Sequence, residues 1–226
     1  MNFMQELTMM KNLKNKFVVI KKFLFVSLAV VTIGLGWKLP VLGYIVPVVM
    51  LTAVVLSLYN GRYHCGNICP RGMFLSVFFI KKSKNALIPV FLKKMSFRLM
   101  VMGVLMGFLV FRIAQNPTSI DYVGRVFWLM CAVTTGVGII LGFIYKPRTW
   151  CSFCPVGTMQ KIIGRHSTNI QIDKNLCLNC KVCEKKCPIN IDILSTVKET
   201  EVTGSDCLKC SLCISQCPKK ALSWGS

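Results

Sequence analysis

The chain has 226 residues, is 54% hydrophobic and carries a formal net charge of +20 at pH 7. This apolar share, gathered in long blocks, excludes an ordinary soluble domain and predicts a membrane protein. The excess positive charge lies in residues 1–170, which hold 20 Lys and Arg against two acids, and this placement favours an anionic membrane surface over nucleic acid as the partner.

Uncharged apolar runs predict four transmembrane helices. The runs lie at residues 23–37, 39–61, 99–111 and 126–145. The second and fourth are long enough to cross a bilayer unaided. We expect Lys21 and Lys22 to extend the first by snorkelling, and Arg98 and Arg112 to extend the third. The alternative is two spans with two interfacial helices.

The distribution of positive charge predicts the orientation of these helices. The stretches 1–22 and 60–98 together hold 13 Lys and Arg, whereas the connections around Lys38 and at 112–125 hold three. Because positively charged loops stay inside, we expect a multi-pass protein of the cytoplasmic (inner) membrane with both termini in the cytoplasm.

Two similar cysteine–proline phrases follow the predicted second and fourth helices. They read "YHCGNICPRGMF" at 63–74 and "TWCSFCPVGTMQ" at 149–160. Each follows a helical pair, so the sequence predicts two tandem repeats in the membrane part. The corresponding positions are Arg62 with Arg148, Pro70 with Pro155, and Gly72 with Gly157.

The last part of the chain contains two cysteine runs, "CLNCKVCEKKCP" at 177–188 and "CLKCSLCISQCP" at 207–218. This spacing is typical of two-cluster bacterial ferredoxins, in which the fourth cysteine of each run binds the other cluster. Structural zinc would not need the third cysteine or the proline, and disulfides would need an oxidising compartment. The predicted ligands are Cys177, Cys180, Cys183 and Cys217 for cluster one, and Cys207, Cys210, Cys213 and Cys187 for cluster two.

The cysteines of the two phrases are Cys65, Cys69, Cys151 and Cys154. If the repeats pack about a common axis, these thiols converge below the membrane, where four thiolates can bind a third [4Fe–4S] cluster or another soft metal. Two alternatives remain open. The pairs can act as redox dithiols, or each cysteine–proline pair can simply cap a helix.

With these motifs the chain resembles the membrane-bound polyferredoxins, over about residues 20–220. It is most similar in size and order of parts to the NapH-type quinol dehydrogenase subunit, and is related to the NosR and CcoG proteins. The resemblance implies electron transfer between the quinol pool or a flavoprotein and a partner reductase, with a cytoplasmic ferredoxin part. Cys65 and Cys69 match the family's first membrane motif, whereas Cys151 and Cys154 lack one intervening residue.

The expected fold is thus a membrane all-α domain at 23–165, after a basic N-terminus at 1–22, with an α+β two-cluster ferredoxin domain at 166–226. No C-x-x-C-H motif is present, and both histidines lie outside the predicted spans, so we expect no haem. We interpret the chain as an electron-transfer subunit without a substrate of its own. The alternatives are a cupric-type metal reductase and a redox assembly factor or sensor.

Overall fold

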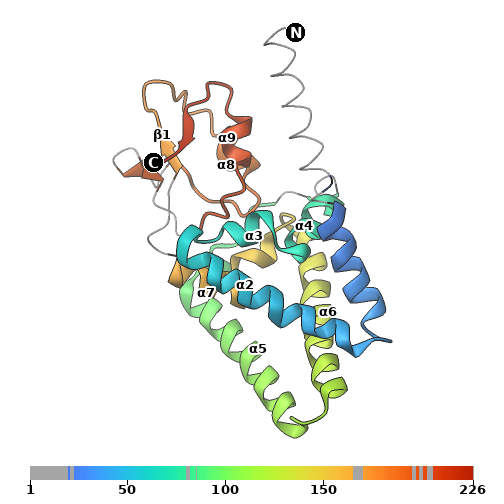
Figure 1. Cartoon of the computed structure of the whole chain (residues 1–226). Helices are drawn as coiled ribbons and strands as arrows, with labels where there is room; N and C mark the ends of the chain where they lie inside the picture. The colour runs from blue at the N-terminus through green and yellow to red at the C-terminus, as the bar shows by residue number, and fades with distance from the viewer. Residues whose placement is uncertain are drawn as a thin grey trace, which may run out of the picture.

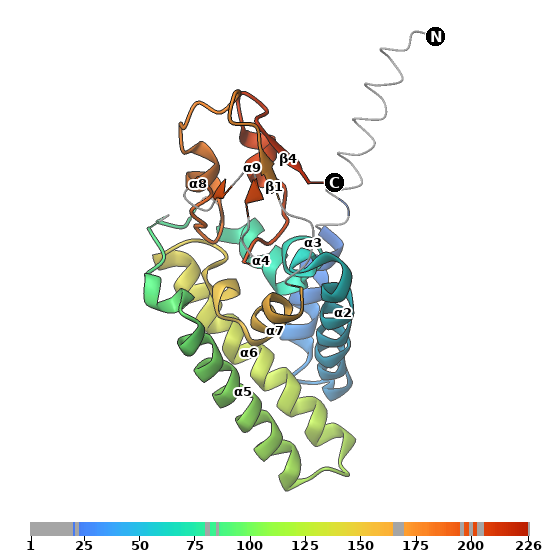
Figure 2. The ribbon, with the colours of Figure 1, turned by 90° about the vertical axis from the view of Figure 1, so that its left-hand side faces the viewer.

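The computed structural model describes residues 20, 23–79, 82–84, 86–164, 170–194, 197–198, 201–202 and 206–225. The long helices form a bundle, and the smaller C-terminal tail packs against one end of this bundle (Figures 1 and 2). The expected basic N-terminus, apart from Ile20, and the expected domain boundary at 165/166 lie outside the described residues.

The long helices follow the apolar runs. They are Phe23–Leu35, the 3-10 turn η1 (Pro40–Tyr44) continuing into α2 (Ile45–Asn60), α5 (Met95–Gln115) and α6 (Ile120–Ile144). Three of them, counting η1 and α2 as one, are long and apolar enough to cross a membrane. Phe23–Leu35 is shorter and reaches about 20 Å, against a bilayer core of about 30 Å. The described structure therefore supports three of the four predicted spans by length.

The third span differs from its prediction. Helix α5 has 21 residues and contains both Arg98 and Arg112, so it is longer than the uncharged run at 99–111. Arg98 does not snorkel to solvent, because its side chain is 1% exposed and is paired with Asp206 of the tail. An arginine predicted to face the membrane surface instead joins two parts of the protein.

Each cysteine–proline phrase folds into a short helical turn followed by a longer helix. The elements are α3 (Tyr63–Asn67) and α4 (Pro70–Phe79) in the first phrase, and η3 (Thr149–Ser152) and α7 (Pro155–Ile163) in the second. Proline is the first residue of α4 and of α7. At this position a backbone N–H would have no partner within the helix, so its absence in proline costs no hydrogen bond. Gly61, with φ of 55°, ends α2 and turns the chain toward the first phrase.

Helix α6 lies against the first helical pair. The Trp128 indole donates to the Ile33 carbonyl at 3.0 Å, and the Tyr44 hydroxyl donates to the Ile120 carbonyl at 3.0 Å. Helix α7 packs against both α2 and α5, so the second phrase is wedged between the two helical pairs.

The segment between α4 and α5 contains the 3-10 turn η2 (Val90–Lys93). Ile88 and Leu92 are buried against Trp150 and Phe153 of the second phrase. The segment that leads into α5 is therefore partly packed into the protein.

The tail is built on a small antiparallel sheet with strand order β2-β3-β1-β4. Its elements are β1 (Ile170–Ile172), α8 (Val182–Lys186), β2 (Val197–Lys198), β3 (Glu201–Val202), α9 (Leu212–Gln216) and β4 (Leu222–Trp224). Ile170 pairs with both Val202 and Trp224, so β1 is central. The described tail thus has the mixed α and β character that the sequence predicts.

Both phrases lie at the end of the bundle that meets the tail. In both views α3 and α4 stand between the long helices and the tail, and the α5–α6 turn is at the far end (Figures 1 and 2). The cysteines of the phrases are consequently close to the cysteine runs.

Candidate iron–sulfur sites

The four cysteines predicted for cluster one lie together in the tail. They line one small cavity between β1, α8 and β4. The apolar residues around it include Ile172 and Leu222, both of which belong to the buried core of the tail. An apolar pocket lined by four thiols suits a [4Fe–4S] cluster, which is held by four cysteine thiolates.

The four cysteines predicted for cluster two also face one another. Burial, together with the charges of the adjacent Cys207, Cys210 and Cys187 thiols, raises the pKa of the Cys213 thiol to about 12. Burial likewise raises the pKa of Cys207 to about 11. The fourth cysteine of the first run, Cys187, therefore lies with the second run, as the ferredoxin spacing predicts.

The backbone around the two runs is wound in the same way. In each run three residues have a left-handed backbone conformation. Two of them lie two and four positions after the first cysteine, and one lies three positions after the fourth cysteine. They are Asn179, Lys181 and Asn190 in the first run, and Lys209, Ser211 and Lys220 in the second. Non-glycine residues rarely adopt this conformation, and such strain gathers at functional sites. Both loops thus share one geometry that wraps three thiols around a common centre.

The four cysteines of the phrases line a second, larger cavity of about 150 Å³. It is bounded by side chains from the long helices, including Leu28, Met50 and Met130. Cys65 and Cys151 each feel the charges of Cys69 and Cys154, so the four thiols form one electrostatic group. The structure therefore brings these thiols together, as the repeat predicts.

Three arginines surround this group of thiols. Arg62 donates to the Cys151 carbonyl, and Arg148 donates to the Cys65 carbonyl at 3.1 Å, so each phrase is bound by an arginine of the other. Arg71 donates to the Cys154 sulfur at 3.2 Å. The Arg62 and Arg148 side chains are almost completely buried. Buried positive charge needs a negative partner, and a cluster with four thiolates is anionic.

The raised pKa values of Cys65 and Cys151, one cysteine of each phrase, do not favour a dithiol redox function. Burial raises the pKa of Cys151 to about 11 and also raises that of Cys65, although Arg148 and Arg62 oppose the effect. Reactive cysteines have a lowered pKa, whereas buried thiols with a raised pKa are inert until a metal displaces their protons.

Among the described residues no group of three or more His, Cys, Asp or Glu side chains is close enough to hold one metal ion. A [4Fe–4S] cluster is held differently, because each thiolate binds a different iron.

His64 lies in the same cavity, beside Cys65. Its side chain is 2% exposed, and neither ring nitrogen has a partner in the described part of the chain. Burial lowers the pKa of His64 to about 4, which leaves the imidazole neutral. The sequence indicated only that this histidine lies outside the spans.

The phrases and the second cysteine run are in direct contact. Cys65 and Cys151 belong to one buried apolar cluster with Cys187 and Leu208 of the tail. Gly66 fits against the Leu208 carbonyl oxygen so closely that any Cβ would collide with it. The candidate site of the phrases therefore adjoins the cysteines predicted for cluster two.

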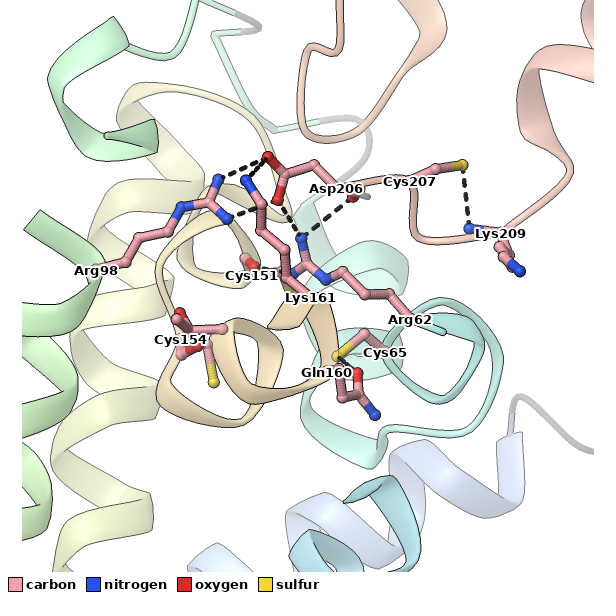
Figure 3. Close-up of polar contacts among 11 residues, drawn as sticks. Arg62, Cys65, Arg98, Cys151, Cys154, Gln160, Lys161, Asp206, Cys207 and Lys209 are labelled. Atoms are coloured by element: carbon pink, nitrogen blue, oxygen red, sulfur yellow. Dashed lines mark hydrogen bonds and ion pairs between the residues drawn. The ribbon is translucent and has the colours of Figure 1, made fainter. Parts of the chain in front are cut away.

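Asp206, which precedes Cys207, joins the two parts electrostatically (Figure 3). Its carboxylate accepts from Arg98 at 2.6 Å, Arg62 at 3.1 Å and Lys161 at 2.8 Å. Burial would raise the pKa of Asp206, but these cations hold it below its usual value. Sequence reasoning missed this contact, although an acid next to a ligand cysteine is a usable signal.

Two lysines tie the tail to the bundle through backbone oxygens. Lys146 donates to the Cys187 carbonyl at 2.8 Å, and Lys93 donates to the Asn190 carbonyl at 2.5 Å. Both bonds end in the loop that holds the fourth cysteine of the first run. The basic residues at this junction therefore act within the chain.

Comparisons with known proteins agree with this chemistry. A family model described as a 4Fe-4S binding domain matches residues 42–86 and 125–172, and one described as a 4Fe-4S dicluster domain matches residues 169–218. These matches support an iron–sulfur electron-transfer protein. The first model spans both cysteine–proline phrases, and the second spans both cysteine runs.

Two relatives come from Methanocaldococcus jannaschii, and both are uncharacterized proteins. One is 29% identical, over 85% of this chain and 82% of its own length. The other is 25% identical, over 67% of this chain and 69% of its own length. No solved structure matches the chain.

Proposed function

We propose that the chain is a membrane-anchored relay that passes single electrons through three [4Fe–4S] clusters. Two are held by the cysteine runs of the tail, and the third by Cys65, Cys69, Cys151 and Cys154. By its resemblance to NapH-type subunits, the relay connects the quinol pool or a flavoprotein with a partner reductase, and its tail is cytoplasmic.

The contact of Cys65 and Cys151 with Cys187 and Leu208 carries this proposal. The third cluster and cluster two would then be neighbours across this buried apolar contact. The order of the relay is then third cluster, cluster two, cluster one. Electrons that enter near the bilayer leave at the far end of the tail, or the reverse.

Two further observations support the third cluster. Arg71 and Arg148, which lie beside the thiols and form no ion pair in the described part of the chain, provide positive charge that an anionic cluster would balance. The match to a 4Fe-4S binding domain also covers both phrases rather than the tail alone.

The test is the content of iron and acid-labile sulfide in anaerobically purified protein, together with the EPR spectrum of the reduced state. We expect about twelve of each per chain, falling to about eight in a Cys65→Ser, Cys69→Ser double variant. The matched control is Cys131→Ser, which alters a thiol of the same cavity outside the phrases. About eight in the unchanged protein would contradict the third cluster.

The Cys69→Ala variant tests whether that cluster belongs to the relay. We expect the EPR signals of the tail clusters to remain while electron delivery from a quinol analogue to the tail is lost. Full delivery by this variant would leave the phrase with a structural role only.

A metal reductase of the cupric type is the second candidate function. The soft sulfur donors Met50, Met106 and Met130 line the same cavity as the four thiols, and such donors select Cu(I). Reduced protein whose clusters are reoxidised by Cu(II) alone, without a partner protein, would favour this function.

A further inference from the structure

Cluster one stands at the end of the relay that is farthest from the membrane helices. The loop between β1 and α8, which contains its first two cysteines, lies at the outer end of the tail in both views (Figures 1 and 2). Of the thirteen cysteines, all of which the structure describes, Cys180 is the one that is exposed. Electrons can therefore reach solvent-borne partners most directly at Cys180.

The surface around Cys180 is unusually apolar for a solvent-facing loop. Leu178 is 64% exposed and Leu176 is 48% exposed. Both leucines line the cavity that holds the four cysteines of cluster one. A small apolar contact of this kind, beside the exposed ligand of a redox centre, is suited to a brief encounter with another protein.

Lysines ring this apolar contact. Lys181 and Lys219 line the same cavity as Leu178. Two further lysines are exposed: Lys174, two residues before Leu176, and Lys220, next to Lys219. These positive charges are available at the surface, unlike Lys93 and Lys146, which bond to carbonyl oxygens at the junction with the bundle. A partner that docks here must carry negative charge.

We propose that this distal face, formed by Leu176, Leu178, Cys180, Lys181 and Lys219, docks an acidic one-electron carrier protein. The inference rests on the proposed function, because it assigns a partner to cluster one. Complementary charge steers such a partner and orients its cofactor toward Cys180, and the small contact area keeps the complex short-lived. In each encounter the carrier's cofactor and cluster one exchange one electron, one being oxidised and the other reduced, with no bond formed or broken.

The experiment measures electron transfer from reduced flavodoxin, an acidic one-electron carrier, to the oxidised full-length protein by stopped-flow bleaching of the cluster absorbance. We compare Lys181→Glu and Lys219→Glu with Lys38→Glu, which changes the net charge equally. Lys38 is exposed and lies in the turn between Phe23–Leu35 and η1. Figure 1 shows this turn at the end of the helices that is away from the tail.

At low ionic strength we expect the two distal-face variants to slow the bimolecular rate about tenfold each, while Lys38→Glu keeps the original rate. High salt should slow the original protein and reduce the difference, because salt screens exposed charges. Dithionite, a small reductant, should reduce all four proteins equally. A rate with flavodoxin that is independent of salt and equal in every variant would overturn the proposal.

Iron content and the EPR spectrum, measured first, separate this inference from the proposed function. Protein that lacks tail clusters contradicts the relay itself. Protein with intact clusters but no effect of Lys181→Glu or Lys219→Glu contradicts only the docking face.

Discussion

Arg62, directly before the first phrase, donates a hydrogen bond to the Cys151 carbonyl of the second, and Arg148, directly before the second, donates to the Cys65 carbonyl of the first. The two arginines occupy corresponding positions in the sequence, so the exchange is reciprocal. Because each guanidinium holds the backbone beside a cysteine of the other phrase, it fixes the relative position of the four thiols.

Replacement of Arg148 should therefore disturb the third cluster. Arg148 also donates to the Ser76 hydroxyl at 2.6 Å and to the Gly66 carbonyl at 3.1 Å, a fork that a lysine ammonium cannot reproduce. In Arg148→Lys we expect iron to fall from about twelve to about eight per chain, with unchanged EPR signals from the tail. Arg112→Lys, in the last turn of α5, should retain all of the iron. An equal loss of iron in Arg148→Lys and Arg112→Lys would contradict this role of Arg148.

Asp206 forms ion pairs with Arg62, Arg98 and Lys161, which we call the Asp206 clamp. This clamp should stabilise the docking of the tail. Asp206→Asn keeps the shape of the side chain but leaves the buried Arg62 and Arg98 without their negative partner. Because the carboxylate is 27% exposed, we expect a loss of about 2–3 kcal/mol rather than the larger cost of a fully buried pair. Chemical denaturation of the anaerobic protein, followed by cluster absorbance, measures the loss.

Lys161→Gln provides the comparison for Asp206→Asn. Lys161 is more exposed than the two arginines, so its loss should cost less than 1 kcal/mol. Equal stabilities of Asp206→Asn and the unchanged protein would show that the clamp does not hold the tail.

The contact between Gly66 and Leu208 should leave no room for a side chain at position 66. Gly66 is helical, so alanine would ordinarily favour its local structure, but the added Cβ would collide with the Leu208 carbonyl. We expect Gly66→Ala to destabilise the protein by about 1–3 kcal/mol and to slow transfer between the third cluster and cluster two. Gly103→Ala in α5, where no atom lies within 4 Å, should have neither effect.

The three clusters should differ in their resistance to oxidative loss. Cys180 of cluster one is exposed, whereas Cys65, Cys151 and Cys154 are buried. Under ferricyanide with an iron chelator, we expect about four iron atoms per chain to be released first, with loss of one tail EPR signal. Release of all iron in a single phase would mean that exposure does not decide the order.

The sequence alone was enough to predict which cysteines of the tail lie together. The spacing of each cysteine run assigns Cys187 and Cys217 to the opposite clusters, and the structure places Cys187 with the second run and Cys217 with the first. Local spacing succeeds here because three ligands of each cluster lie within seven residues, where the chain has few ways to wrap one centre. The apolar runs also predicted three helices of sufficient length, because hydrophobic length is a local property.

Only the tertiary structure decided how the parts meet. Nothing near Arg98 in the sequence indicates Asp206, 108 positions later, so charge patterning alone placed Arg98 at the membrane surface. The same holds for Gly66, because the Leu208 carbonyl, distant in sequence, leaves no room for a side chain at this position. Such contacts depend on the relative position of two separately folded parts, which packing determines and local sequence does not.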